Sequence, residues 1–210
     1  MSGPQRVVVA TANAHKLVEI RAILAAHGVE VELVPMTELG VPSPPEDGGS
    51  FEANALIKAR ACAAATGLVA LADDSGLAVD ALDGAPGVDS AYYAGPEADD
   101  EANNAELLAA LAEVPASQRT ARFVCVAAAV VPDGREVVVR GEMPGRVVDA
   151  PRGQHGFGYD PLFVADATSD GRTNGELTRA EKDAISHRGA AFRALADRLP
   201  ALLTPSAEGS

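Results

Sequence analysis

In the first part of the chain, short apolar runs alternate with segments of helical periodicity. A β-branched run at 6–10 is followed, from Asn13 onward, by apolar residues that share one helical face, including Leu17 and Ile20. Gly28 then ends this pattern, as glycine often does at the end of a helix. We therefore predict a buried strand, a short loop and a helix.

The same alternation continues along the next part of the chain. Ser50 is a good N-cap and Gly67 a good terminator for a helix. The predicted elements are a strand at 29–34, a helix at 51–66, a strand at 68–72 and a helix at 99–112.

Strands follow one another in the second half. Residues 120–131 and 136–140 flank a Pro-Asp-Gly turn and predict a hairpin, and a last helix is expected over 186–199. This order favours a mixed α/β fold over a purely parallel sheet. We expect a single domain over residues 1–204 and a disordered tail at 205–210.

Composition narrows the classes of function. The chain has 210 residues, of which 47% are hydrophobic, which is enough for one good core. A net charge of −13 argues against a nucleic-acid partner. The longest apolar run, 123–132, suits a buried strand better than a membrane span, so we expect a cytoplasmic protein. Cys62 and Cys125 are predicted to be small buried hydrophobes.

Two adjacent carboxylates are the clearest candidates for chemistry. Asp73 and Asp74 directly follow the predicted strand at 68–72, and Ser75 and Gly76 are expected to turn the chain. Neighbouring strand residues point to opposite sides, so one carboxylate can face a ligand. Mg²⁺ prefers one or two carboxylates with waters and phosphates. The alternative is an Asx-turn that only closes the strand.

The few lysines lie in or near polar motifs. Of the 17 lysine and arginine residues, only Lys16, Lys58 and Lys182 are lysines. A lysine ammonium meets a phosphate as a compact point charge. Thr11 and Asn13 precede Lys16 between a strand and a helix, where an anion is favoured. An ordinary N-capped helix is the alternative, and the glycines of a Walker A loop are missing.

A glycine-flanked aromatic loop lies at 156–163, with the sequence GFGYDPLF. Phe157 and Tyr159 could present an aromatic face to a planar ligand, or could simply pack in a turn. Asp160 precedes a proline and is expected to be extended.

Lys182, His187 and Arg188 gather near a predicted helix start, where cations are unfavourable and therefore suggest function. Alternatively, Lys182 closes the preceding helix.

Five motifs in a fixed order carry a family resemblance that covers roughly residues 6–200. They are TANAHK, FEANALIKA, LADDSGLAVDALDGAPGV, GFGYDPLF and LTRAEKDAISHRG. In these motifs the chain resembles the inosine triphosphate pyrophosphatase (Ham1-like) family, whose members cleave ITP, dITP and XTP to monophosphate and pyrophosphate. The resemblance implies a long twisted mixed β-sheet flanked by helices in two lobes, with the active-site cleft between them. It also implies a Mg²⁺-dependent homodimer that clears deaminated purines.

The resemblance implies roles for individual residues. Asp74 would be the catalytic base and a metal ligand together with Glu46, and Asp73 is a less certain ligand. The implied substrate-binding residues are Thr11, Asn13, Lys16, Lys58, Ser75, Phe157, Gly158, Tyr159, Asp160, Lys182, His187 and Arg188.

The chain departs from the family pattern at two places. Ala53 stands where many relatives carry an acid, and Tyr92 stands where relatives usually have arginine. We assign no role to positions 52, 53 and 92. Two other functions stay open: a Maf-like pyrophosphatase for modified pyrimidine nucleotides, and a nucleotide-binding regulator that does not hydrolyse.

Overall fold

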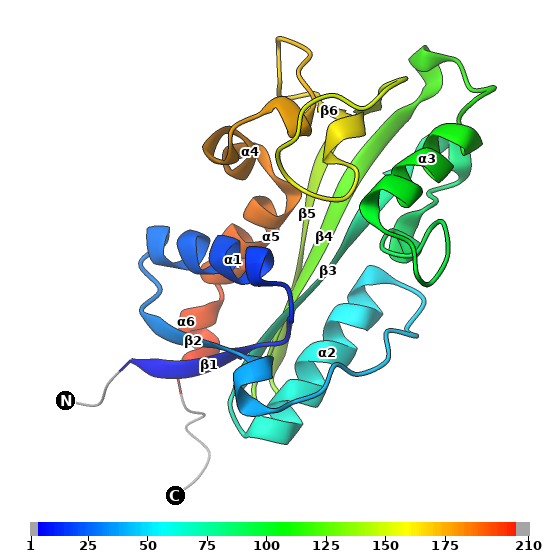
Figure 1. Ribbon diagram of the computed structural model, residues 1–210. Coiled ribbons are helices and arrows are strands. Elements are labelled where there is room, and N and C mark those ends of the chain that lie inside the picture. The colour runs from blue at the N-terminus through cyan, green and yellow to red at the C-terminus, as the bar shows by residue number, and fades with distance from the viewer. Residues whose placement is uncertain (1–3, 205–210) are drawn as a thin grey trace, which may run out of the picture. The chain divides into compact units, whose positions relative to one another are not determined.

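The computed structural model describes residues 4–204 and contains one mixed sheet of six strands (Figure 1). The strand order is β2-β1-β3-β4-β5-β6. The strands are β1 (Gln5–Val9), β2 (Val31–Pro35), β3 (Val69–Val79), β4 (Thr120–Val130), β5 (Glu136–Val147) and β6 (Phe163–Ala165). The helices are α1 (Ala14–Ala26), α2 (Phe51–Thr66), α3 (Asp100–Ala110), α4 (Arg179–Ile185), α5 (His187–Ala196) and α6 (Leu199–Leu203). The mixed α/β class predicted from the sequence is confirmed.

The first part of the sheet is parallel, because helices connect its strands. β1 pairs in parallel with both β2 and β3. Helix α2 has the predicted bounds: Ser50 Oγ accepts a hydrogen bond from Ala53 N at 3.1 Å, and Gly67 ends the helix with a φ of 66°. A left-handed φ of this kind is easiest for glycine.

The turn expected at Ser75 and Gly76 is wrong. Strand β3 continues through both residues to Val79, and every residue of the strand except Ser75 is buried. Its second half is held in place by Leu77, whose N–H donates to Ser90 Oγ at 2.9 Å. The apolar run from Leu77 to Val79 can therefore continue the strand past the two aspartates.

The predicted hairpin is confirmed, but β5 is longer than expected. Beyond residue 140 it alternates exposed and buried residues as far as Val147, as a half-buried strand should. β5 then pairs with β6 in antiparallel fashion. β6 has only three residues, too few to give a period in the sequence.

The last helix begins where the sequence predicts, since α5 starts at His187, but it ends at Ala196 and not at residue 199. Ser186 has an extended backbone with a ψ of 146°, which separates α4 from α5. Pro200 lies in the first turn of α6. Because proline has no N–H and clashes with the preceding turn, it cannot continue a helix begun upstream.

The described chain forms two compact units. One consists of the segment ending at Asp74, Val126–Gly141 and the segment beginning at Gly189; the other consists of Ser75–Cys125 and Glu142–Arg188. The second unit has its own apolar core, which includes Leu77, Leu107 and Phe163. The predicted tail at 205–210 lies outside the described residues. Within residues 4–204, no helix is both long and apolar enough to cross a membrane.

Gly145 provides a test of the packing between β5 and β6. A Cβ at this position would lie 2.2 Å from the Val164 carbonyl oxygen and 2.6 Å from the Phe163 ring. We expect Gly145→Ala to reduce the free energy of unfolding by about 1–3 kcal/mol, since the backbone must move. Urea unfolding measures the change, and Arg146→Ala, at an exposed position on the same strand, is the control. A Gly145→Ala variant as stable as the control would contradict this packing.

Candidate active site

Two buried carboxylates lie next to each other in β3, and each is paired with a lysine. Lys16 Nζ donates to Asp73 Oδ2 at 3.0 Å, and Lys58 Nζ donates to Asp74 Oδ1 at 3.2 Å. The Asp73 side chain is 2% exposed and that of Asp74 is 12% exposed. Because neighbouring strand residues point to opposite sides, α1 neutralises one carboxylate and α2 the other.

Lys58 joins Asp74 to a second carboxylate. Its ammonium also donates to Glu46 Oε2 at 2.6 Å. Glu46 lies in the loop before α2, and its side chain is 43% exposed. The two residues predicted to hold a metal are therefore brought to one cationic group in the first unit.

Asn54 fixes the other oxygen of Asp74. Its Nδ2 donates to Asp74 Oδ2 at 3.1 Å, and its Oδ1 accepts from Gly48 N at 2.9 Å. A Cβ on Gly48 would lie 2.6 Å from Ala53 Cβ, so the loop fits here only with glycine. Asn54 was not among the predicted site residues. The available signal was its position one helical turn before Lys58, on the same face of α2.

The pKa values of the two paired groups are both raised. Burial raises the pKa of Asp74, and Glu46 adds to this, while Lys58 and Asn54 act in the opposite direction. Burial lowers the pKa of Lys58, but Asp74, Glu46 and Asp73 outweigh it, so the value lies above its usual range. A carboxylate with a raised pKa accepts a proton more readily, which suits a general base.

The residues before α1 make local contacts. Thr11 Oγ1 accepts from Asn13 N at 3.1 Å, and Asn13 Oδ1 accepts from Lys16 N at 3.2 Å. These are the contacts of the N-capped helix that the sequence left as an alternative. A role for Thr11 and Asn13 in binding phosphate stays a prediction.

The donor set fits a hard divalent cation. Glu46 and Asp74 offer carboxylate oxygens to the same cationic group, and Mg²⁺ takes one or two carboxylates and completes its shell with water and phosphate. Among residues 4–204 there is no group of three or more His, Cys, Asp or Glu side chains that could hold a metal on their own. A metal here would therefore depend on oxygen ligands from water or substrate.

A second cluster is organised by Asp160, which is 2% exposed. Asp160 Oδ2 accepts from Phe157 N at 2.9 Å and from Lys182 Nζ, while Oδ1 accepts from Asn174 Nδ2 at 3.2 Å. The expectation of an extended Asp160 is wrong, since the residue begins a 3-10 turn that ends at Leu162. Asn174, which is fully buried, is a further residue that the sequence motifs did not single out.

Two cationic side chains lie near the ring of Phe157. Lys182 Nζ lies 4.9 Å and Arg188 Cζ lies 5.8 Å from the ring centroid. Both distances are within the range of cation–π attraction. Phe157 is nevertheless 39% exposed, so part of its surface is available to a planar ligand.

Two other predicted base-binding residues are packed inside the second unit. Tyr159 lies in the apolar core, its hydroxyl donates to Ser90 O at 2.8 Å, and burial raises its pKa. His187 stacks on Phe123 with a centroid distance of 4.9 Å and an interplanar angle of 13°. Ser75 is partly buried in β3.

The motifs agree with comparisons to known proteins. A sequence profile of the Ham1 family matches residues 7–198. The chain belongs to the Ham1 family. It is 57% identical over 204 residues to the dITP/XTP pyrophosphatase of Frankia alni, covering 95% of this chain and 99% of that protein. It is 55% identical to the dITP/XTP pyrophosphatase of Nocardia farcinica, covering 94% and 96%.

Solved Ham1 structures share the fold. A HAM1 protein from Coxiella burnetii is similar with a TM-score of 0.86 and 42% identity, covering 94% of this chain and 99% of that chain. A dITP/XTP pyrophosphatase structure from Mycobacterium abscessus gives a TM-score of 0.75 and 51% identity, covering 94% and 100%. The sheet and its flanking helices are therefore those of Ham1 proteins.

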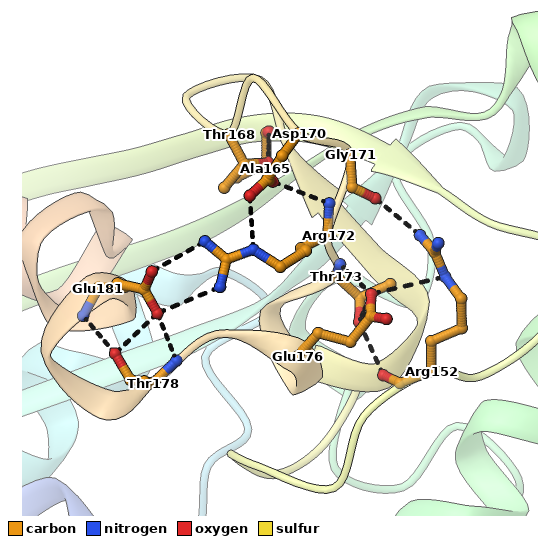
Figure 2. A network of polar contacts seen from close by, with 10 residues as sticks. All are labelled: Arg152, Ala165, Thr168, Asp170, Gly171, Arg172, Thr173, Glu176, Thr178 and Glu181. Atoms are coloured by element: carbon orange, nitrogen blue, oxygen red, sulfur yellow. Dashed lines mark hydrogen bonds and ion pairs between the residues drawn. The ribbon is translucent and has the colours of Figure 1, made fainter.

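In this Ham1 chain, a polar network holds the helix that carries Lys182 (Figure 2). Glu181 accepts from Thr178 N and Thr178 Oγ1 in a capping box at the start of α4. Arg172 Nη2 donates to Glu181 Oε1 at 2.8 Å, and Arg172 Nε donates to Asp170 Oδ2 at 2.6 Å. Lys182 lies in the last turn of α4, where a cation is favourable, and its ammonium pairs with Asp160.

The capping contact predicts a titration that can be measured. Hydrogen bonds from Arg172, and then from Thr178, lower the pKa of Glu181 from its usual 4.5 to about 2. Because the folded-state pKa is lowered, this contribution to stability is fully present above 4.5 and is lost as the pH falls toward 2. NMR titration of the Glu181 carboxyl carbon should give this low value, and Arg172→Gln should raise it toward 4.5.

Arg179→Gln on the same helix is the control and should leave the titration of Glu181 unchanged. A Glu181 pKa near its usual value in the unmodified protein would contradict the network.

Proposed function

We propose that this chain is a Mg²⁺-dependent pyrophosphatase that hydrolyses dITP, XTP and ITP to the monophosphate and pyrophosphate. The observation that carries the proposal is the buried Asp74, which shares Lys58 with Glu46. Relatives more than 50% identical over nearly the whole chain are named dITP/XTP pyrophosphatases, which supports the choice of substrate. The biological result would be removal of deaminated purines from the nucleotide pool.

The first unit would bind the phosphates. Lys16 and Lys58 would meet the phosphates together with the metal, because both lysines already pair with carboxylates and the chain has a net charge of −13. Glu46 and Asp74 would hold Mg²⁺, with Asp73 as a less certain ligand. When bound, the ion supplies charge neutralisation for the leaving pyrophosphate and lowers the pKa of a bound water.

Asp74 would act as the general base. Its carboxylate accepts the proton of the water that attacks the α-phosphorus, and the P–O bond to the leaving pyrophosphate breaks in line with that attack. Asn54 holds one oxygen of Asp74 in a fixed direction. Burial of Asp74 raises its pKa and so favours proton transfer to it.

The second unit would recognise the base. Phe157 would stack on the purine, and Lys182, His187 and Arg188 would offer donors to its 6-keto oxygen. The 6-amino group of ATP brings a donor against these donors, and leaving buried polar groups unpaired can discriminate by about 10⁴-fold or more. The contacts of Lys182 and Arg188 with the Phe157 ring support this assignment.

The other functions are less well supported. Membership of the Ham1 family does not favour a Maf-like enzyme for modified pyrimidine nucleotides. A regulator that binds without hydrolysis would be expected to lack a metal-binding carboxylate, yet Glu46, Asp73 and Asp74 are all present. The proposal includes a cytoplasmic homodimer without nucleic-acid or membrane partners, which rests on the family resemblance and the net charge. Light scattering of the purified protein tests the dimer.

A substrate panel tests the reaction. We expect pyrophosphate release from ITP, dITP and XTP with Mg²⁺, little release from ATP and dTTP, and none with EDTA. GTP, which shares the 6-keto group, is included to measure the effect of its 2-amino group. Ion chromatography of the products measures it. Turnover that is equally fast with EDTA would contradict the role of the metal, and a preference for pyrimidine nucleotides would favour the Maf-like alternative.

Substitution of Asp74 tests the base. Asp74→Asn should lower kcat by about 10²–10⁴-fold or more, because the amide cannot accept the proton. Circular dichroism should show an intact fold, and Asp197→Asn, at an exposed position of the first unit, is the matched control. Unchanged turnover in Asp74→Asn would remove this assignment.

A further inference from the structure

Helix α3 holds both polar backbone groups of Gly158. Asp100 Oδ2 accepts from Gly158 N at 2.6 Å, and Asn104 Nδ2 donates to Gly158 O at 2.9 Å. The two side chains are four residues apart and so lie on the same face of α3. This is a two-point clamp on one residue of the aromatic loop, and no role has been given above to either side chain.

The helix that makes this clamp is itself well fixed. Leu107 and Leu111 are fully buried in the core of the second unit, and Asp99 caps the start of α3. Asn103 Nδ2 donates to Ala91 O at 3.1 Å, and Asn103 Oδ1 accepts from Ala94 N at 2.9 Å. A helix anchored on several sides can hold a loop in a defined position.

The clamp acts directly beside Phe157. Gly158 has a φ of 60°, a left-handed conformation, and a Cβ there would meet nothing within 4 Å. Backbone geometry alone, and not close packing, therefore calls for glycine at this position. Phe157 N donates to Asp160 Oδ2, and Gly158 N donates to Asp100 Oδ2. Side-chain carboxylates therefore accept from the two N–H groups that flank the Phe157 carbonyl. These bonds fix the backbone from which the Phe157 side chain projects.

One polar atom of Asn104 is in an unfavourable environment. Its Oδ1 is buried and has no hydrogen-bond partner among the described residues. A buried polar atom without a partner is unfavourable, because it has lost the hydrogen bond that water would give it. A side chain that carries such a cost at a loop next to a binding cluster points to a functional demand on that loop.

We propose that Asp100 and Asn104 are positioning residues that set the orientation of Phe157 and thereby the affinity for the purine base. This inference rests on the proposed function, in which Phe157 stacks on that base. Neither residue touches the substrate; each acts through Gly158. The affinity for the phosphates, which the first unit would bind, does not depend on them.

The test measures the binding of the base and the binding of the phosphates separately. Calorimetry measures the dissociation constants of inosine, which has a base without phosphates, and of tripolyphosphate, which has phosphates without a base. In the double variant Asp100→Ala/Asn104→Ala we expect about 10-fold weaker inosine binding, from the loss of two hydrogen bonds. The KM for ITP should rise to a similar extent, while kcat and tripolyphosphate affinity stay within about 2-fold of the wild-type values.

Control variants keep the test specific. Glu101→Ala/Glu106→Ala changes two exposed residues of the same helix and should leave all four quantities unchanged. Asp100→Asn keeps an oxygen acceptor for Gly158 N and should retain most of the inosine affinity.

Two outcomes would overturn the inference. One is wild-type inosine affinity in the double variant while ITP is turned over normally; the other is an equal loss of inosine and tripolyphosphate binding, which indicates a general loss of structure. If the wild-type protein neither binds inosine nor hydrolyses ITP, the proposed function fails as well.

Discussion

The burial of adjacent carboxylates within β3 is the constraint on which the first unit depends. A buried charge is tolerated only when it is paired and hydrogen-bonded, so Asp73 and Asp74 require Lys16 and Lys58 at fixed places on α1 and α2. Removing one partner of such a pair typically costs about 3–5 kcal/mol. The positions of both helices on β3 are therefore tied to the same side chains that are proposed to bind and cleave the triphosphate.

The second unit also contains a buried carboxylate, that of Asp160. Its buried carboxylate is paired with Lys182 and also holds the backbone of Phe157. All three lysines of the chain thus pair with a buried aspartate. Fixed cations of this kind are organised before a ligand arrives, which reduces the cost of ordering them on binding.

Local signals predicted much of this molecule. The caps of α2 and the alternation of strands and helices are short-range features, and both were read correctly from the sequence. The continuation of β3 past Asp74 was not, because it depends on tertiary contacts: Leu77 N donates to Ser90 Oγ, and the two aspartates pair with Lys16 and Lys58. The same holds for Asn54 and Asn174, whose roles follow from tertiary contacts with Asp74 and Asp160. The 3-10 turn that begins at Asp160 contains Pro161 in its first turn, and the carboxylate of Asp160 is held by partners from other segments, Lys182 and Asn174.

The most direct test of the account is whether Asp74 and Glu46 bind a divalent cation. Electron paramagnetic resonance of Mn²⁺, added with an ITP analogue that cannot be cleaved between the α- and β-phosphates, reports bound metal. The account predicts a bound-Mn²⁺ signal in the wild-type protein that is strongly reduced in Glu46→Gln and Asp74→Asn but kept in Asp197→Asn. Full Mn²⁺ binding by Asp74→Asn would contradict it.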